Sequence, residues 1–429
     1  MWSDETLSAT WALAWLLLTI VGFIYARALA DIWYTRARER WLGNTLLVVL
    51  LIALVVRLVP SLLLPVGAGY DIESFRLTGE AFLAGEDVYT SAAMGRHPYL
   101  PMQVYLIGLA SFGAESTSLP FVFLIKLPAL IADVIITAVI YSTGKRSGMS
   151  REITLNWALL YALNPISIMV TAYHGQFDSV TVMLLLFAWY FWHFGQRLLV
   201  SATALGFAIL NKTWPVVFLP IILLRITTIR KRITYTTLSV LIPVTFTIGY
   251  IVIFDADSRT MLNRALTHTG VPGYWGLSAM LAVASDTWDA LQDVYDGLTA
   301  IRRWLILAAG LYALWRTRKQ SSLEALVTVI LCVFAVTVGM GLQWLLWVVP
   351  FAILANDIRW LKRYCLVGTL FLVFQLFGYH MVPWASHLFS PVTVNTLLRL
   401  VSIPIWIVMA WWAIDRLKRA RVLPGNLTS

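Results

Sequence analysis

Long apolar segments separated by short polar loops dominate the sequence. About thirteen of them approach the roughly 20 residues that a membrane-spanning helix needs. They lie near residues 11–30, 44–66, 119–142, 153–172, 176–193, 198–211, 213–224, 233–254, 301–315, 322–339, 342–356, 363–380 and 392–414. Several are short, and the pair 198–211 and 213–224 is typical of a broken hairpin. The pattern predicts an all-α polytopic membrane protein with about 11–13 transmembrane helices.

The polar stretches between the apolar segments are too short to form a second domain. The stretches 67–118 and 255–300 are too short to fold alone, so we predict a single membrane-embedded domain over residues 1–429. The first apolar segment is too long for the apolar core of a signal peptide. It predicts an uncleaved helix, which makes 11–43 an extra N-terminal helix with a cytoplasmic loop.

Lys and Arg cluster in loops that fall on one side of the predicted bundle. These loops are 34–40, 144–151, 225–232, 316–319, 359–363 and 415–421. The positive-inside rule places them and the C-terminus in the cytoplasm, and the N-terminus outside. The two longer stretches then share the outer side with the polar clusters at 173–179 and 339–347. This convergence predicts a site at the outer membrane–water boundary.

Composition agrees with this class and excludes others. Hydrophobic residues make up 59% of the chain and charged residues 13%, with a mean hydropathy of +0.77, which no soluble globular domain approaches. The 20 Trp and 17 Tyr suit aromatic belts at the membrane surface. The net charge of +10 is explained by the basic loops, so we expect no nucleic-acid partner. Cys332 and Cys365 lie in apolar segments and form no disulfide or metal pattern.

Two carboxylates follow the second apolar segment directly, in the sequence GYDIESF. Asp71 is a candidate general base, because a carboxylate at a low-dielectric boundary can accept a proton from a hydroxyl. The alternative for Asp71 is a helix N-cap. The following residues predict an amphipathic helix along the membrane surface. Glu73, the second catalytic candidate, shares its polar side with Arg76 and Glu80, so an ion pair with Arg76 is the alternative.

Polar residues at two further junctions add candidates for acid–base chemistry or sugar binding. Tyr99 lies between Pro98 and Pro101, and His97 comes directly before Pro98. His97 is either a second acid or base or a solvated loop residue. The sequence YHGQFDSV (173–180) predicts hydrogen bonds to sugar hydroxyls or, for its aspartate, a cap on the next helix. Its candidate ligands are His174, Gln176 and Asp178.

Cations at helix ends are candidates for binding a lipid phosphate. Lys212 lies at a break between apolar stretches, where a charge is costly. It predicts an anionic headgroup or a carboxylate such as Asp178 as its partner, or else snorkelling to the interface. Arg264 and His268 lie in the second outer stretch. Arg57, inside the second apolar segment, is expected to pair within the bundle.

Aromatic residues near those cations suit a sugar, although aromatic anchoring alone also explains them. Tyr274 and Trp275 follow Arg264 and His268 in the same stretch. Gln343 and Trp344 lie at the outer end of a later apolar segment.

Six stretches in this order resemble the GT-C superfamily of membrane glycosyltransferases. They are RLVPSLLLPVGAGYDIESFRLTGEAFLAGEDVY (57–89), HPYLP (97–101), NPISIMVTAYHGQFDSV (164–180), NKTWPVVFLP (211–220), YWGLS (274–278) and LQWLLWVVP (342–350). The likeness is to polyprenyl-phosphate-mannose-dependent mannosyltransferases, such as the first mannosyltransferase of GPI-anchor synthesis and bacterial relatives. The family's Asp-x-Asp is Asp71-Ile72-Glu73 here, which favours Asp71 over Glu73. The family's Gln-Tyr is Gln343-Trp344.

The resemblance implies a GT-C-type bundle and an inverting transfer of one sugar from a polyprenyl-phosphate donor. Asp71 would take the proton of an acceptor hydroxyl, and Lys212 and Arg264, with Arg76 and Arg96 behind them, would meet the carrier phosphate. Mannose is the expected sugar, with glucose and arabinose open, and the acceptor is a lipid, a glycan or a protein. The resemblance implies no cofactor and no metal. A prokaryotic plasma membrane is expected, with the endoplasmic reticulum as the alternative.

Two other functions remain open from the residues alone. A glycolipid transporter or flippase would need polar residues through the depth of the bundle and repeats for alternating access. A lipid-linked oligosaccharide ligase or polymerase would use a diphosphate donor and tends to have a larger, Arg- and His-rich later loop. The stretch 255–300 is modest in length and holds several Asp, which argues against the ligase.

Overall fold

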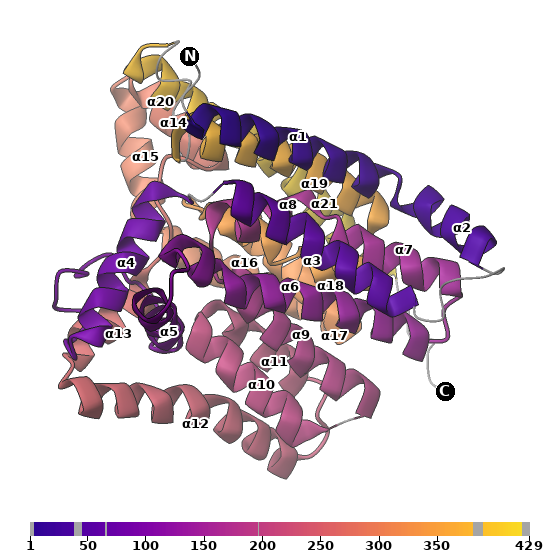
Figure 1. Ribbon diagram of the computed structural model, residues 1–429. Helices are drawn as coiled ribbons and strands as arrows, with labels where there is room; N and C mark the ends of the chain where they lie inside the picture. Colours follow the sequence, from indigo (N-terminus) through magenta and orange to yellow (C-terminus); the bar gives the residue numbers. More distant parts are fainter. Residues whose placement is uncertain (1–3, 38–44, 65–66, 196, 381–388, 423–429) are drawn as a thin grey trace. The chain divides into compact units, whose positions relative to one another are not determined.

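A computed structural model describes residues 4–37, 45–64, 67–195, 197–380 and 389–422 (Figure 1). Within these ranges the regular elements are helices, and one isolated bridge joins Pro272 to Gly339. The predicted class, an all-α polytopic membrane protein, is confirmed. Parts of the predicted cytoplasmic loop 34–43 and the last residues of the chain lie outside the described ranges.

Seven helices of the described chain are long and apolar enough to cross a membrane. They are Leu7–Ile24, Thr45–Leu63, Phe121–Arg146, Arg151–His174, Ile229–Phe254, Ile358–Gly378 and Pro391–Ala420. An eighth forms if the pair Ala290–Ala300 and Arg302–Arg316, bent by 57°, counts as one span. Several other predicted segments form helices too short to count, among them Leu198–Asn211 and Ser322–Val336. Within the described residues, seven or eight helices thus meet the criterion of length and composition, fewer than the predicted 11–13.

Residue contacts divide the chain into two compact units that are interleaved in sequence. Unit 1 comprises residues 1–219, 226–268 and 380–382, and unit 2 comprises 220–225, 269–379 and 383–429. Helix α11 (Phe218–Leu223) is divided between them. The expectation of a single embedded domain stays a prediction, and each unit is described by itself.

Unit 1 is built around α6, whose neighbours are α3, α5, α7 and α9 (Figure 1). Helix α9 packs on α10, and α10 packs on α12. The bounds are α1 (Asp4–Ile24), α2 (Ala26–Ala37), α3 (Thr45–Leu63), α4 (Gly69–Leu83), α5 (Met102–Ser116), α6 (Phe121–Arg146), α7 (Arg151–Ala162), α8 (Pro165–Ile168), the π-helix η1 (Met169–His174), α9 (Asp178–Gly195), α10 (Leu198–Asn211), the 3-10 helix η2 (Trp214–Val217), α12 (Ile229–Phe254) and α13 (Ser258–Thr267).

A buried ion pair crosses the centre of unit 1. Arg57 Nε donates to Asp133 Oδ2 at 2.7 Å, and both side chains are 0% exposed. Further donors to the same carboxylate are Tyr161, Ser167, Thr171 and Ser179. A buried ion pair repays the cost of its desolvation when further hydrogen bonds satisfy the remaining lone pairs and N–H groups of the two side chains. The predicted pairing of Arg57 within the bundle is therefore confirmed.

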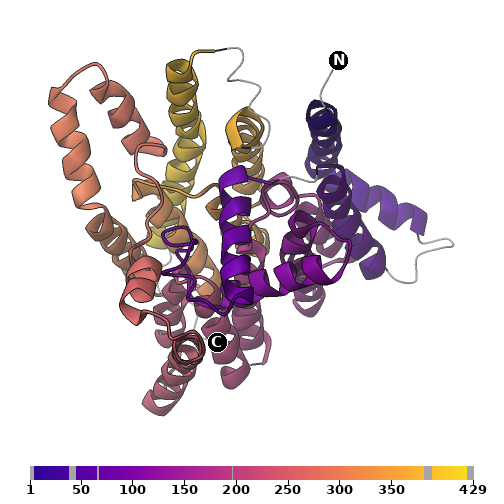
Figure 2. The same ribbon diagram turned by 60° about the vertical axis from the view of Figure 1, so that its left-hand side comes forward.

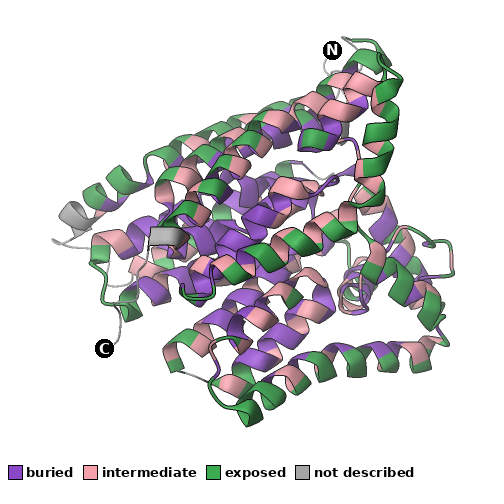
Figure 3. Cartoon of the chain, turned by 180° about the vertical axis from the view of Figure 1, so that it is seen from behind, coloured by how far each residue is buried: buried purple, intermediate pink, exposed green. Residues whose placement is uncertain are grey.

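The outward faces of the unit are apolar and exposed, as a lipid-facing surface requires. Helix α12 presents Ile229, Ile233, Val252 and Ile253 to the outside. Figure 3 shows this helix largely exposed along its length, while the interior helices of the unit are buried. Exposed apolar side chains on a helix of this length are expected in a bilayer.

Unit 2 is centred on α17, which packs against α16, α18 and α21. Helix α17 begins with a capping box formed by Ser321 and Glu324. The bounds are α14 (Gly276–Ser285), α15 (Ala290–Ala300), α16 (Arg302–Arg316), α17 (Ser322–Val336), the 3-10 helix η3 (Leu342–Leu346), α18 (Val349–Leu354), α19 (Ile358–Gln375), the π-helix η4 (Leu376–His380), α20 (Pro391–Leu400) and α21 (Ser402–Val422).

Candidate active site

Asp71 lies in the first turn of α4, next to the last residue of η1, His174. The N-cap of α4 is Ala68, so the N-cap interpretation of Asp71 is wrong. The Ala68 N–H donates to the His174 carbonyl at 3.2 Å. Gly67 lets the chain pass this close, because a Cβ there would lie 2.8 Å from the same carbonyl. An anionic side chain in a first turn is favoured by the helix dipole.

The carboxylate of Asp71 is held by two side chains that lie about a hundred residues further along the chain. Gln176 Nε2 donates to Asp71 Oδ2 at 2.9 Å, and His174 Nε2 lies 3.2 Å from the same oxygen. The His174 side chain is 4% exposed, whereas that of Asp71 is 31% exposed. Buried donors therefore fix a carboxylate that solvent can still reach, which is the arrangement a general base needs.

A backbone irregularity brings these two donors to Asp71. The chain leaves η1 through Gly175, whose φ of 89° is left-handed. Gly175 N–H and Gln176 N–H both donate to the Val170 carbonyl at 3.1 Å. A side chain at Gly175 would be strained and would meet Ile72 Cδ1 at 3.2 Å. Single-turn π-helices are frequent at functional sites, and this one turns His174 and Gln176 toward α4.

Lys212 is bound to Asp178 in the interior of unit 1. Its Nζ donates to Asp178 Oδ2 at 2.6 Å, with the side chains 3% and 0% exposed. Asp178 is the first residue of α9, and Lys212 lies in extended conformation where α10 ends. The ammonium also lies 4.5 Å from the centre of the Tyr99 ring. The predicted carboxylate partner is confirmed, and the snorkelling interpretation is wrong because the side chain is buried.

His97 and Tyr99 extend this cluster as a row of ring contacts. The Tyr99 ring centre lies 5.7 Å from that of His97 and 6.2 Å from that of His268. Burial lowers the pKa of His97 to about 3. The side chain of His268 is exposed, and partial desolvation together with the charge of Lys212 lowers its pKa. Burial also raises the pKa of Tyr99. His97 is 3% exposed, so the interpretation as a solvated loop residue is wrong, and its role as an acid, a base or a sugar ligand stays a prediction.

We expect His97 to make the folded state sensitive to acid. Its folded-state pKa is below the ordinary value of about 6.5, so stability is lost as pH falls from about 6.5 toward 3, by up to about 1.4 kcal/mol for each pH unit. The variant His97→Phe removes the titrating group and keeps a ring beside Tyr99. Its unfolding midpoint should fall less steeply than that of wild type between pH 6.5 and 5. Equal slopes would contradict the low pKa.

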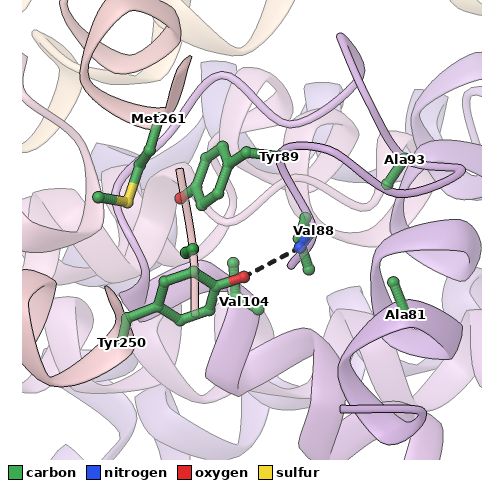
Figure 4. Packing of buried hydrophobic residues seen from close by; sticks show 8 residues of the cluster. Ala81, Val88, Tyr89, Ala93, Val104, Tyr250 and Met261 are labelled. Atoms are coloured by element: carbon green, nitrogen blue, oxygen red, sulfur yellow. Dashed lines mark hydrogen bonds between the residues drawn. The ribbon is translucent and has the colours of Figure 1, made fainter. Parts of the chain in front are cut away.

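The loop that carries these rings is anchored on α12 and α13. Tyr250 Oη accepts the Val88 N–H at 3.0 Å, and Tyr89 packs edge-on against Tyr250 (Figure 4). Met261 of α13 belongs to the same buried cluster. Helices α4, α5 and α13 gather at this end of α12 (Figures 1 and 2). The stretches 67–118 and 255–268, both predicted on the outer side, therefore lie together.

Helix α4 is confirmed, and its charged side forms the predicted ion pairs. Arg76 donates to both oxygens of Glu73, at 2.7 and 2.8 Å, and also to Glu80. This hydrogen bond with Arg76 lowers the pKa of Glu73. The apolar side packs through Phe75 against Phe177, with ring centres 5.2 Å apart. Because Glu73 is paired with Arg76, Asp71 is the better candidate for the base. The two carboxylates of Glu73 and Glu80 also neutralise the charge of Arg76.

Two other arginines lie at the loop 84–101, one within it and one packed over it. The Arg96 guanidinium lies 4.8 Å from the centre of the Tyr70 ring, and its Nη1 is buried without a hydrogen-bond partner in the described part of the chain. Arg264 projects from α13 over Gly95, where its Nη2 would lie 3.5 Å from an added Cβ. Two guanidinium groups near one loop can bind a phosphate.

The four remaining candidates belong to unit 2 and cluster there. Gly270 and Gly339 touch, since a Cβ on Gly339 would lie 2.7 Å from the Gly270 carbonyl carbon. This contact brings the two motifs that follow these glycines together. Trp275 is fully buried, with Nε1 donating to the Phe334 carbonyl at 3.0 Å, and Tyr274 Oη donates to Asn395 Oδ1 at 2.7 Å. Gln343 is buried, and Trp344 stacks on Trp347 with ring centres 5.0 Å apart. Their role in sugar binding stays a prediction.

Comparison with known protein families decides the class of enzyme. The model of glycosyltransferase family 87 matches residues 104–342, more than half of the 429-residue chain. The chain belongs to glycosyltransferase family 87. A search of the curated proteins found no match. The resemblance to membrane glycosyltransferases is thus confirmed, and its likeness to mannosyltransferases stays a prediction. The matched range holds His174, Gln176, Asp178, Lys212 and Arg264.

Sequence analysis missed two residues of this site. Tyr70 supports Arg96, and no pattern distinguishes it from an interfacial tyrosine. Lys126 lies buried in α6 beneath Gly175, and the rule that singled out Lys212, a charge inside an apolar segment, would have found it. Within the described ranges no group of three or more His, Cys, Asp or Glu residues could hold a metal ion. The expected independence from metal stays a prediction.

Proposed function

We propose that this glycosyltransferase moves a single sugar, with mannose as the first candidate, from a polyprenyl-phosphate carrier to an acceptor hydroxyl, with inversion. The observation that carries the proposal is the partly exposed carboxylate of Asp71, fixed by the buried donors of His174 and Gln176. The acceptor is a lipid, a glycan or a protein. No cofactor takes part in the proposed step.

In the proposed step, the oxygen of the acceptor hydroxyl attacks the anomeric carbon of the donor sugar. Its proton passes to the carboxylate of Asp71. The bond between the anomeric carbon and the phosphate oxygen breaks, and its electron pair leaves with the polyprenyl monophosphate. Attack opposite to the leaving group inverts the anomeric configuration. A positioned base of this kind contributes about 10²- to 10⁴-fold to the rate.

The geometry favours Arg96 and Arg264 as the partners of the carrier phosphate. Lys212 is already paired with Asp178, and Arg76 is paired with Glu73 and Glu80. Arg96 instead stacks on Tyr70, and its buried Nη1 has no hydrogen-bond partner in the described part of the chain. The exposed Arg264 lies over Gly95, the residue before Arg96. Charge develops on the leaving phosphate, so fixed cations there lower the barrier.

We expect Arg96→Met to raise the KM for the donor and the inhibition constant of free polyprenyl phosphate together. A charge-assisted hydrogen bond contributes about 1.5–3 kcal/mol, which corresponds to roughly 10- to 100-fold. Arg259→Met is the matched control, because Arg259 is an exposed arginine on the same helix as Arg264. Unchanged product inhibition in Arg96→Met would remove Arg96 from the phosphate site.

The site is proposed to face the outside of a prokaryotic plasma membrane, with the C-terminus in the cytoplasm. The support is the positive-inside rule, which places the basic loops in the cytoplasm. Counted along the sequence, these loops and Asp71 fall at opposite ends of the apolar segments. A cysteine at Glu86, in the exposed part of the loop 84–101, should react with a membrane-impermeant maleimide on intact cells. A cysteine at Lys145 should react only after lysis. The reverse pattern would overturn the orientation.

In the deciding experiment, purified protein in detergent is incubated with acceptor extracts and one donor at a time. The donors are polyprenyl-phosphate mannose, polyprenyl-phosphate glucose and polyprenyl-phosphate arabinose. The expected result is turnover of one donor, release of polyprenyl monophosphate, and a product whose anomeric configuration, read by NMR, is inverted. Release of a diphosphate carrier from a lipid-linked oligosaccharide would favour the ligase. Movement of glycolipid across vesicles without sugar transfer would favour the flippase. Retention of configuration would overturn the proposed step.

A further inference from the structure

A lysine inside a membrane-spanning helix lies directly beneath the site and takes no part in the proposed step. Lys126 belongs to α6 and is 0% exposed. Its Nζ donates to the Ala172 carbonyl at 2.8 Å and lies 3.5 Å from the Leu64 carbonyl. An amine in a bilayer interior is costly, and the usual reason for its presence is function. Two of its partners here are backbone carbonyls of the two segments that carry the site.

The first of these segments is η1, and α6 supports it at two levels. In a π-helix the i to i−4 bonds are replaced by i to i−5 bonds, as from the Gly175 N–H to the Val170 carbonyl, and carbonyls near the end of the helix need other partners. Lys126 binds the Ala172 carbonyl, and Asp133, two turns later on the same face of α6, accepts from Thr171 Oγ1 at 2.6 Å. The position of His174, the last residue of η1, is set by these contacts.

The second segment leads into α4. Leu64 follows α3, and Ile72 is the neighbour of Asp71. The side chains of Lys126 and Ile72 meet at Gly175, where an added Cβ would lie 3.5 Å from Lys126 Cε and 3.2 Å from Ile72 Cδ1. Lys126 therefore contacts the turn between His174 and Gln176 from below, while Ile72 contacts it from α4.

We propose that Lys126 is a positioning residue, which holds the Asp71 segment and the His174–Gln176 turn in register so that the three side chains meet. The inference rests on the proposed function for its effect on catalysis. A displacement of about 1 Å in a reacting group can cost on the order of 10²-fold in rate. Loss of this amine should therefore lower kcat much more than it changes donor binding.

The test is Lys126→Met, which keeps the length of the side chain and removes the donors. We expect kcat to fall about 10- to 100-fold with KM for the donor little changed. Hydrogen–deuterium exchange should rise in peptides covering 67–83 and 169–178, because the bond from Ala68 N–H to the His174 carbonyl opens. Should this variant fail to fold, Lys126→Gln, which keeps a shorter donor, is expected to give an intermediate loss of kcat.

The matched control is Ser201→Ala. Ser201 is buried and donates to the Ala188 carbonyl at 2.7 Å, an interhelical bond of the same kind in another part of unit 1. It should leave exchange of both segments and kcat unchanged. Exchange that stays at the wild-type level in Lys126→Met, or rises equally in Ser201→Ala, would overturn the inference. Because exchange needs no substrate, it tests the inference even if wild type turns over no donor, the result that would sink the proposed function.

Discussion

Asp71→Asn is expected to lower the rate of sugar transfer about 10²- to 10⁴-fold, while the protein stays folded. Asn has the shape of Asp and keeps an oxygen that can accept from Gln176, but it cannot take the acceptor's proton. The measurement is the initial rate with the donor that wild type uses, together with the thermal unfolding midpoint of each variant. Binding of polyprenyl phosphate should be retained, because the proposed phosphate ligands are other residues.

Two carboxylates of the same region serve as controls for this prediction. Glu86→Gln removes an exposed negative charge from the loop that follows α4, and its activity should equal that of wild type. Glu73→Gln breaks the solvent-exposed pair with Arg76 and should cost little activity, because exposed ion pairs contribute little to stability. An inactive Glu73→Gln beside an active Asp71→Asn would transfer the role of base to Glu73 and contradict the assignment.

The charged contacts of the site follow from the sequence because charges in apolar segments need partners. That rule anticipated the pairing of Lys212 with Asp178 and of Arg57 within the bundle. Residue spacing anticipated the contact of Glu73 with Arg76. Each of these arguments needs only the cost of an isolated charge or the geometry of one helix, and both can be read from a single sequence.

The contacts of Asp71 could not be predicted in the same way. They depend on the π-helix η1 and on the left-handed Gly175, and neither has a signature in the local sequence. Sequence reasoning proposed His174 and Gln176 as sugar ligands, which stays a prediction, and did not anticipate their contacts with Asp71. Sequence reasoning also predicted more full-length spans than the described residues contain, because apolar character alone does not reveal where a helix such as α10 ends.

Lys212→Met is expected to destabilise the protein by about 3–5 kcal/mol, because it leaves the buried carboxylate of Asp178 without its cation. The methionine fills the space of the lysine stem and can stay in contact with the Tyr99 ring. The expected loss is therefore that of a charge partner and not of packing. The measurement is the unfolding midpoint in detergent, compared with wild type at the same pH and salt.

The double variant Lys212→Met with Asp178→Asn decides what this ion pair does. Removing both charges removes the uncompensated carboxylate, so most of the lost stability should return. If Lys212 also served the carrier phosphate, the double variant would be stable but would bind free polyprenyl phosphate more weakly than wild type. Stability and phosphate binding that both recover would show that Lys212 holds the end of α10 against α9. The proposed phosphate site would then rest on Arg96 and Arg264. A single variant as stable as wild type would contradict the buried pair itself.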